Sequence, residues 1–393
     1  MKSGFNVKIV DDTHIQIGGR IDSSNAQALE ESLKPFIVQD FDFLTIDAED
    51  LSYISSAGLR VLMKLRSKAR NTITIENMPE TVNQIFEMTG FSQLFKVRKG
   101  FRHVSVEGCP VIGVGFFGTV YRLDPDTIVK VYHPSVNISQ IENEQKMAKA
   151  AFLKGIPTAI SYDIVKVGDS YGSVFELLKA VSFNDLVIQH PDQVDDIVKK
   201  WCDILKIVHS TYMEPGVMPS AKKIYFQYLD AIRTYLDESQ YQFLHQYLEK
   251  IPERLTVVHG DFQMKNIMLS GNDPMLIDMD TMATGHPIFD FAGIYVAYVE
   301  FEEDEPGNMQ RFLGISADTA NYIFEKLVEY YLETTNAALL ATEIQKIRIV
   351  SAIRFLYIII MSDLKNSELG QKRIHTTKEH INEFMKQSET LNF

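Results

Sequence analysis

The feature that most constrains this chain is a pair of short apolar runs, each followed by side chains that can bind ions or exchange protons. Val257-Val258 leads into His259-Gly260-Asp261, and Asn266 follows five residues after Asp261. A second apolar run, Met275-Leu276-Ile277, ends at Asp278. Short apolar segments of this kind can fix polar side chains at strand ends. An isolated His-Gly-Asp is usually a turn, but the added Asn and the second Asp argue against that simple interpretation.

These residue types suit the transfer of a phosphoryl group. We expect Asp261 to accept the proton of an attacking hydroxyl, as the catalytic base does in kinase-like enzymes. Asn266 and Asp278 would hold Mg²⁺ against the phosphates of a nucleotide. Carboxylate and amide oxygens are the hard ligands that Mg²⁺ prefers.

The same residues carry a family resemblance. His259-Gly260-Asp261 with Asn266, followed by Ile277-Asp278, resembles the aminoglycoside phosphotransferase and choline kinase branch of the protein-kinase-like superfamily. Ordinary protein kinases have Arg at the position of Gly260. The resemblance runs from about residue 101 onward and implies an α+β bilobal protein-kinase-like domain that uses ATP and Mg²⁺. It further implies that Asp290 braces the catalytic loop and that His259 orients it.

A glycine-rich segment lies upstream, where Gly113, Gly115 and Gly118 form a G-x-G-x-x-G-x-V pattern. Dinucleotide-binding folds share this pattern, but there a helix follows it. Here two strand-like runs follow, Val120–Leu123 and Thr127–Tyr132, around an Asp-Pro-Asp turn. This order is typical of a kinase glycine loop over ATP phosphates.

Lys130 lies in the second of these strands, and we expect it to contact the α and β phosphates. Its ion-pair partner should come from the helix expected over Ser139–Leu153, where Glu142 and Glu144 compete. Similarity to the family's pattern favours Glu144. The strand expected over Val174–Leu178 would lead into the hinge between the lobes, where backbone groups of Glu176 to Leu178 would meet adenine.

The first hundred residues alternate between strand and helix patterns, which indicates a small α/β layer structure. The expected strands are Phe5–Val10, His14–Ile17, Phe43–Ala48 and Ile73–Ile75, and the expected helices are Ala26–Phe36, one opening at Ser55, one starting at Glu80, and a short one ending near Phe95. Asp50 to Leu62 resembles the signature of STAS domains, the fold of anti-sigma-factor antagonists. The resemblance implies that this domain regulates the enzyme or binds an anti-sigma-factor-like or other STAS-binding partner.

Two serines open the helix in that signature. In STAS domains a serine at this turn is the phosphorylation switch, and alignment on Gly58-Leu59 places Ser56 there. A phosphate would meet free N–H groups at the helix start and would add about −1.5 to −2 charge. The alternative is that Ser55 and Ser56 only cap the helix. Both interpretations stay open.

We therefore predict a STAS-like regulatory domain over residues 1–99 and a kinase-like phosphotransferase domain over 100–393. Its N-lobe would span about 100–178 and its C-lobe about 179–393. Short strands are expected at Val104–Val106 and Val111–Ile112. Helical patterns in the C-lobe cover Val194–His209, Tyr225–Tyr247, Thr319–Glu333 and Thr342–Met361.

Charge and cysteine usage limit the partners. A net charge of −13 argues against nucleic acid or an anionic membrane, because both favour basic surfaces. Cys109 and Cys202 form no disulfide framework and lack metal-site spacing. The N-terminus shows no apolar run of a secretion signal. These features predict a cytoplasmic location.

Three functions fit the pattern. The first is an ATP-dependent phosphotransferase acting on the hydroxyl of a small molecule. The second is a protein kinase for a STAS serine, its own or a partner's, and the third is a nucleotide-sensing pseudokinase joined to a STAS module. The first is favoured because only eleven residues separate Asp278 from Asp290, leaving no room for a peptide-binding activation segment. The pseudokinase is disfavoured because the expected catalytic residues are present.

Two acidic features stay ambiguous. Asp280 could support the site or contact a second metal ion. The run Glu300 to Glu305 could lie near the substrate mouth and favour a cationic hydroxyl compound, or it could be a solvated acidic loop.

Overall fold

The computed structural model describes residues 4–115 and 118–387. The chain divides into two compact units, residues 1–109 with 164–172, and residues 110–163 with 173–393. Within the described residues, none of the helices combines the length and the apolarity needed to cross a membrane.

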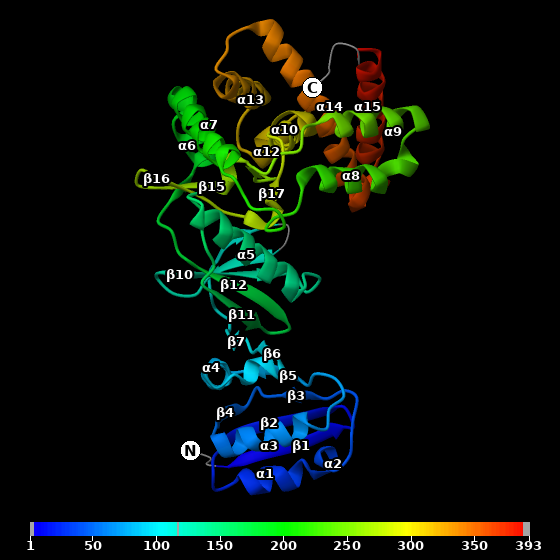
Figure 1. Cartoon of the computed structure of the whole chain (residues 1–393). Helices are drawn as coiled ribbons and strands as arrows, with labels where there is room; N and C mark the ends of the chain where they lie inside the picture. Colours follow the sequence, from blue (N-terminus) through cyan, green and yellow to red (C-terminus); the bar gives the residue numbers. More distant parts are fainter. Residues whose placement is uncertain (1–3, 116–117, 388–393) are drawn as a thin grey trace. The chain divides into compact units, whose positions relative to one another are not determined.

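The first unit is built on a sheet in which only the first pairing is antiparallel. Its elements are β1 (Phe5–Asp11), β2 (His14–Ile21), α1 (Ala26–Ser32), α2 (Lys34–Ile37), β3 (Thr45–Asp47), β4 (Leu51–Ile54), α3 (Ser56–Arg66), β5 (Thr74–Met78), α4 (Glu80–Thr89), a 3₁₀ turn (Phe91–Gln93), β6 (Lys96–Lys99) and β7 (Arg102–His103). The strands follow the order β1-β2-β3-β5-β6, with β4 also paired to β2. Helices α1 and α3 lie side by side (Figure 1).

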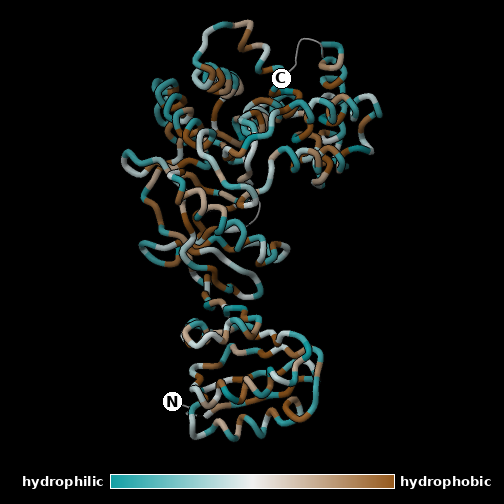
Figure 2. Tube along the Cα trace, viewed as in Figure 1, coloured by the Kyte–Doolittle hydropathy of each residue, from teal (hydrophilic) through white to brown (hydrophobic). Residues whose placement is uncertain are grey.

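The alternating strand pattern explains the core of this unit. Ile15, Ile17 and Ile21 of β2 are all buried, and so are Ile46 of β3 and Ile75 of β5. These side chains occupy the interior in every second position of a strand, as a half-buried strand requires. Figure 2 shows apolar residues gathered on these strands and hydrophilic residues recurring along the helices.

The start of α3 separates the roles of the two serines. Ser55 is the N-cap, and its side chain accepts a hydrogen bond from the backbone N–H of Gly58 at 3.4 Å. Ser56 is the first helical residue, and its side chain is exposed. Capping is therefore a property of Ser55, and Ser56 is accessible at the helix terminus.

Replacing Ser55 by Ala is expected to lower the stability of the first unit by about 1 kcal/mol, because the cap accepts an otherwise unpaired N–H. Replacing Ser56 by Ala should change stability by less than about 0.5 kcal/mol. Urea unfolding of the full chain, followed by a probe in the first unit, measures both. Equal losses in the two variants would contradict the division of roles.

The second unit combines strands of three sheets with a larger helical part. Its strands are β8 (Val111–Val114), β9 (Gly118–Arg122), β10 (Thr127–Tyr132), β12 (Ser170–Glu176), β13 (Val181–Ser182), β14 (Val257–Val258), β15 (Ile267–Ser270), β16 (Asp273–Leu276) and β17 (Ala283–Thr284). β12 begins in the first unit, after β11 (Asp163–Val167), and β12, β10, β9 and β8 are neighbours in that order.

The helices of this unit alternate with its strands along the chain. They are α5 (Ile138–Leu153), α6 (Phe183–Gln189), α7 (Val194–Ser210), α8 (Ala221–Ile232), α9 (Glu238–Lys250), α10 (Ile288–Tyr295), α11 (Phe301–Glu303), α12 (Asn308–Phe312), α13 (Ala317–Leu332), α14 (Ala337–Met361) and α15 (Glu368–Lys386). A five-residue π-helix, Val296–Glu300, joins α10 to α11. Figure 1 shows α5 beside the strands and the remaining helices gathered in a second lobe.

Three expected elements differ from the structure. The predicted helix over Ala26–Phe36 is interrupted at Leu33, because Pro35 can only occupy the first turn of a new helix. The helical pattern over Tyr225–Tyr247 is two helices, since Asp237 forms the capping box of α9. The predicted strand Val104–Val106 is wrong, and β7 at Arg102–His103 pairs in parallel with β11 instead.

Candidate active site

The geometry of the site begins with a hairpin. Asn266 directly precedes β15 and Asp278 follows β16 closely, and Ile267 is paired with Leu276. Residues that flank the paired ends of an antiparallel hairpin lie at the same end of it. The N–H of Ile277 donates to the carbonyl oxygen of Asn266 at 2.9 Å, which ties the two positions together. Asn266 and Asp278 are thus neighbours by backbone topology.

Asp278 has a left-handed backbone, with φ of 61° and ψ of 63°. This conformation is uncommon outside glycine, and Asp tolerates it better than bulky residues do. Strained conformations of this kind persist where the surrounding structure holds them, and they are found at functional sites. At Asp278 the chain leaves the direction of β16 and enters a 3₁₀ turn.

Lys130 links the sheet to the hairpin. Its ammonium makes an ion pair with Asp278 and lies 3.7 Å from Glu144 Oε1 on α5. Glu142, the competing glutamate, is exposed and lies on another face of α5. Lys130 and Asp278 are 148 residues apart in the chain, so this contact is made by the fold alone.

A second layer supports Glu144. The Tyr132 hydroxyl donates to Glu144 Oε2 at 2.9 Å and lies 3.1 Å from the Ser173 hydroxyl. Tyr132 and Lys130 lie on the same side of β10 because their positions differ by two residues. Tyr132 therefore holds one carboxylate oxygen of Glu144 while Lys130 faces the other.

The charges of this cluster are unbalanced, because one ammonium faces several carboxylates. Burial works against the charged lysine, but Glu144 and Asp278 outweigh it and raise the pKa of Lys130. Burial raises the pKa of Glu144 in spite of the lysine. Burial, together with the charges of Asp278 and Glu144, raises the pKa of Asp280 to about 7. Excess negative charge of this kind favours the binding of a cation.

A cleft of about 280 Å³ adjoins this cluster. Its walls include Gly115, Gly118, Lys130, Glu144 and Asp278, together with Phe175, Glu176, Leu177 and Leu178 from the end of β12 and the segment after it. The N–H of Leu177 donates to the carbonyl of Asp126 at 2.7 Å, so it is already used. Glu176 and Leu178, the other two residues of the segment expected to meet adenine, line the same cleft.

The glycine segment contributes to this wall only in part. Gly118 needs to be glycine for packing, since a Cβ there would lie 2.1 Å from the carbonyl oxygen of Val131 on the paired strand β10. A Cβ on Gly115 would make only an ordinary contact, 3.8 Å from the carbonyl oxygen of Gly118, and Gly115 lines the cleft. Gly113 lies in β8. Phe116 and Phe117, the centre of the motif, lie outside the described residues.

The loop that carries Asp261 has a glycine turn. Gly260 has φ of 83°, and a Cβ at this position would lie 2.4 Å from the carbonyl oxygen of Thr281. Both the backbone angle and the close approach require glycine. The Arg that ordinary protein kinases carry here would not fit this turn.

Asp261 is held from both sides. Its Oδ1 accepts from Gln263 Nε2 at 2.5 Å, and its Oδ2 accepts from Asn266 Nδ2 at 2.9 Å. Asn266 Nδ2 also donates to the Asp261 carbonyl. Asp261 does not line the cleft described above, but Asn266 connects it to the hairpin that ends at Asp278.

Asp290 supports this loop from below. Its Oδ2 accepts from the N–H of His259 at 2.8 Å and its Oδ1 accepts from the N–H of Gly260 at 2.6 Å. Burial would raise the pKa of Asp290, but hydrogen bonding to His209 and to the loop lowers it below the usual range. His259 is fully buried, its Nδ1 accepts from the N–H of Asp261 at 3.3 Å, and its Nε2 has no partner among the described residues.

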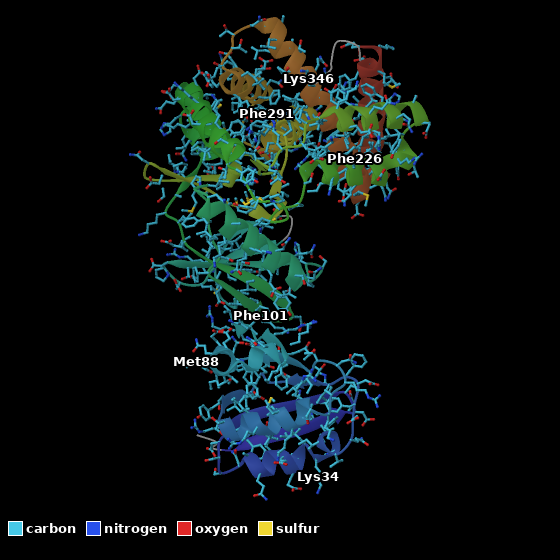
Figure 3. The ribbon with its side chains drawn as sticks, in the orientation of Figure 1. Lys34, Met88, Phe101, Phe226, Phe291 and Lys346 are labelled. Carbon is cyan, nitrogen blue, oxygen red and sulfur yellow. The ribbon has the colours of Figure 1, made fainter. Side chains whose placement is uncertain are left out.

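Several residues of the site carry no local sequence signal. His209 on α7 lies 2.9 Å from Asp290, and its other ring nitrogen lies 2.9 Å from the Tyr331 hydroxyl on α13. Phe291, labelled in Figure 3, packs edge-on against Tyr331. Arg354 on α14 is a further residue near Asp261. These residues come from distant helices, and only the folded chain brings them to the loop.

Most carboxylates of the acidic run Glu300 to Glu305 have partners within the lobe. Glu302 accepts from the N–H groups of Gly307 and Met309, and Glu305 pairs with Arg311 and Arg373. Asp304 pairs with Lys372 and Glu303 with His380, both on α15. Glu300 is buried. These carboxylates hold the lobe together, so the suggestion that they attract a cationic acceptor is not supported.

The donor chemistry fits a Mg²⁺ ion. Asn266 uses its amide N–H group on Asp261, which leaves its Oδ1 as an acceptor, and Asp278 adds a carboxylate. Among the residues that the structure describes, no three His, Cys, Asp or Glu side chains form a preformed metal cage. Mg²⁺ usually takes one or two protein carboxylates and completes its shell with water and phosphate oxygens. The pair is therefore suited to a nucleotide-bound cation.

Comparison with known proteins assigns both units. Residues 110–320 match the family described as "Phosphotransferase enzyme family", and residues 5–105 match the STAS domain. An anti-sigma-B factor antagonist of Listeria monocytogenes is 27% identical over 103 residues, which are 25% of this chain and 90% of that protein.

Solved structures were compared as well. A thermostable mutant of aminoglycoside phosphotransferase APH(4)-Ia is 11% identical, with a TM-score of 0.49 over 71% of this chain and 94% of its own. A choline/ethanolamine kinase family protein of Mesorhizobium loti is 14% identical, with a TM-score of 0.46 over 72% of this chain and 90% of its own.

The family matches confirm the two resemblances on which the fold prediction rested. The α/β unit is a STAS domain, and the second unit has the predicted kinase-like fold. The phosphotransferase match alone spans more than half of the sequence. The chain therefore belongs to the phosphotransferase enzyme family and carries a STAS domain ahead of the matched region.

Proposed function

We propose that this enzyme is an ATP- and Mg²⁺-dependent phosphotransferase that moves the γ-phosphate to a hydroxyl of a small molecule. The observation that carries the proposal is the convergence of Lys130, Glu144 and Asp278 at one cleft. Lys130 would contact phosphate, and Asn266 and Asp278 would hold Mg²⁺, which neutralises charge on the phosphates when bound. Asp261 would orient the acceptor hydroxyl and accept its proton.

The short path from Asp278 to Asp290 supports a small acceptor. After Asp278 the chain makes one 3₁₀ turn, pairs β17 with β14, and enters α10 at Ile288. Every residue of α10 is buried. This path offers no extended segment on which a peptide could lie, so a small molecule is favoured over a protein acceptor.

The STAS domain would supply regulation in the cytoplasm. We propose that it binds a protein partner of the anti-sigma-factor type and that Ser56 is the modification site, because Ser56 is exposed while Ser55 caps α3. A phosphate at Ser56 would meet the positive end of the helix and change the charge of the docking face. Mass spectrometry of the chain isolated from growing and stressed cells tests this, and label on Ser55 alone would contradict it.

The function itself is tested by an acceptor screen with ADP release as the readout. Purified full-length chain, ATP and Mg²⁺ are incubated with amino alcohols, sugars, hydroxy acids and nucleosides. We expect acceptor-dependent ADP release that disappears when Mg²⁺ is chelated. ADP release that no acceptor stimulates, together with phosphate label on a STAS serine, would support the protein-kinase alternative instead.

A further inference from the structure

Helix α14 places a basic side chain beside the catalytic loop. Arg354 lies between the buried residues Ile353 and Phe355 and is itself only partly exposed. A Cβ on Gly293 of α10 would lie 3.3 Å from Arg354 Cζ and Nη1 and 3.4 Å from the carbonyl oxygen of Gly260. The guanidinium therefore reaches the loop through the space that this glycine leaves open.

Aromatic residues of α8 and α14 surround Arg354. Tyr225 is close enough to the guanidinium to raise the pKa of Arg354, and its hydroxyl donates to the carbonyl of Phe289 at 3.3 Å. Tyr228, one turn after Tyr225, stacks on Tyr357, one turn after Arg354, with ring centroids 4.0 Å apart and planes at 23°. Both stacked rings are partly exposed. The two helices thus present a cation and an aromatic surface together.

The charge on Arg354 lacks a close counterion. None of the ion pairs formed among the residues that the structure describes includes Arg354. Burial opposes its charge, but Tyr225 and the nearby carboxylate of Asp261 raise its pKa. A guanidinium has five N–H donors in a planar fork that matches carboxylate and phosphate groups. This fork can donate to the anionic group of a ligand.

We propose that Arg354 determines acceptor specificity and that the acceptor is a hydroxyl compound bearing an anionic group, a carboxylate or a phosphate. This proposal rests on the phosphotransferase function proposed above. The anionic group lies on the guanidinium, an apolar or planar part of the acceptor lies against Tyr228 and Tyr357, and the hydroxyl points to Asp261. This proposal replaces the expectation of a cationic acceptor. That expectation rested on the acidic run Glu300 to Glu305, and most carboxylates of this run have partners within the lobe.

A matched set of probes tests the proposal on the full-length chain. The probes share one aryl ring and one hydroxymethyl group and differ only in charge: 4-(hydroxymethyl)benzoate, the corresponding arylphosphonate, the benzamide and the benzylamine. We expect kcat/KM for the benzoate or the phosphonate to exceed that of the benzamide at least tenfold and that of the benzylamine by more. The carboxylate and phosphonate arms identify which anion is preferred.

The variant Arg354→Gln should lower kcat/KM for the anionic probe by roughly 10- to 100-fold, mainly through KM, since a charge-assisted hydrogen bond is lost. Arg354→Lys should keep part of the preference. Arg311→Gln, which removes an exposed arginine paired with Glu305, is the matched control and should leave selectivity unchanged. Thermal unfolding of each variant separates selectivity from loss of fold.

Calorimetry gives a readout that does not depend on turnover. The benzoate and the benzamide are titrated into wild-type chain saturated with a non-hydrolysable ATP analogue and Mg²⁺, and we expect tighter binding of the benzoate. Equal or weaker binding of the anionic probe, or equal kcat/KM for all charges, would overturn the proposal for Arg354. Absence of ADP release with every acceptor, in contrast, would count against the phosphotransferase function and not against the binding preference.

Discussion

Replacing Asp261 by Asn is expected to reduce acceptor-dependent turnover by about 10²- to 10⁴-fold while ATP binding persists. General-base catalysis contributes a rate factor of about this size, and an amide cannot accept the hydroxyl proton. The cleft proposed to bind ATP is lined by Lys130, Glu144 and Asp278, not by Asp261, so the affinity for ATP should stay near that of the wild type. Single-turnover kinetics and ATP titration measure the two effects separately.

The control for this variant is Asp273→Asn. Asp273 is exposed at the start of β16, and its replacement by Asn removes the same charge from the same unit. It should leave turnover within a factor of two. Because Asp261 accepts bonds from Gln263 and Asn266, the unfolding temperature of Asp261→Asn must be measured as well. Undiminished turnover in a folded Asp261→Asn chain would remove Asp261 from the role of base.

The secondary structure that could be predicted is the part whose signals are local. The strands β9 and β10 around the Asp-Pro-Asp turn, and the helix opening at the Ser55-Ser56 pair, follow from patterns within about ten residues. The break at Leu33 also has a local cause, Pro35, which the helical periodicity of Ala26–Phe36 hides. The pairing of β7 with β11 has no local signal, because it joins segments about sixty residues apart.

The same distinction applies to the site. Asp261, Asn266 and Asp278 lie within eighteen positions, and one hairpin brings their segments together. His209, Tyr331 and Arg354 come from helices α7, α13 and α14, and any of these positions could equally be an ordinary surface or core residue. Their contacts depend on how helices pack, and a single sequence does not contain that information in a local pattern. The acidity of the run Glu300 to Glu305 was also a misleading signal, since Glu303, Asp304 and Glu305 pair with side chains of α12 and α15 and Glu302 accepts from backbone N–H groups.

Replacing Asp290 by Asn is expected to lower the free energy of unfolding of the second unit by about 3 to 5 kcal/mol at pH 7. Asp290 is fully buried and accepts from two backbone N–H groups, while His209 lies 2.9 Å away. The NH₂ group of an asparagine at this position would face another N–H donor where the carboxylate oxygen accepts a hydrogen bond. A buried donor is then left without an acceptor, which costs free energy. Urea unfolding of the full chain, followed by Trp201 fluorescence, reports this unit because Trp201 is buried in its core.

The matched control is Glu300→Gln, which changes another buried carboxyl group of the same lobe. Burial raises the pKa of Glu300 to about 8, so at pH 6 its side chain is neutral in the folded chain and resembles glutamine. This variant should cause no loss at pH 7, because it removes a buried carboxyl group that must keep its proton in the folded wild type. Equal losses in the free energy of unfolding for Asp290→Asn and Glu300→Gln would contradict this explanation. They would show that the hydrogen bonds from the loop to Asp290 do not determine the loss.

The pH dependence of the two variants should have opposite signs. The pKa of Asp290 is lowered by folding, so its contribution is complete above the unfolded Asp value of about 3.9 and disappears as pH falls toward the folded value. The difference between wild type and Asp290→Asn should therefore shrink below about pH 4. The pKa of Glu300 is raised, so the wild type should lose about 1.4 kcal/mol per pH unit from this group between about pH 4.3 and its folded value of about 8. Glu300→Gln removes that slope, and unfolding measured at pH 5 to 8 would reveal it as a gain over the wild type that grows with pH.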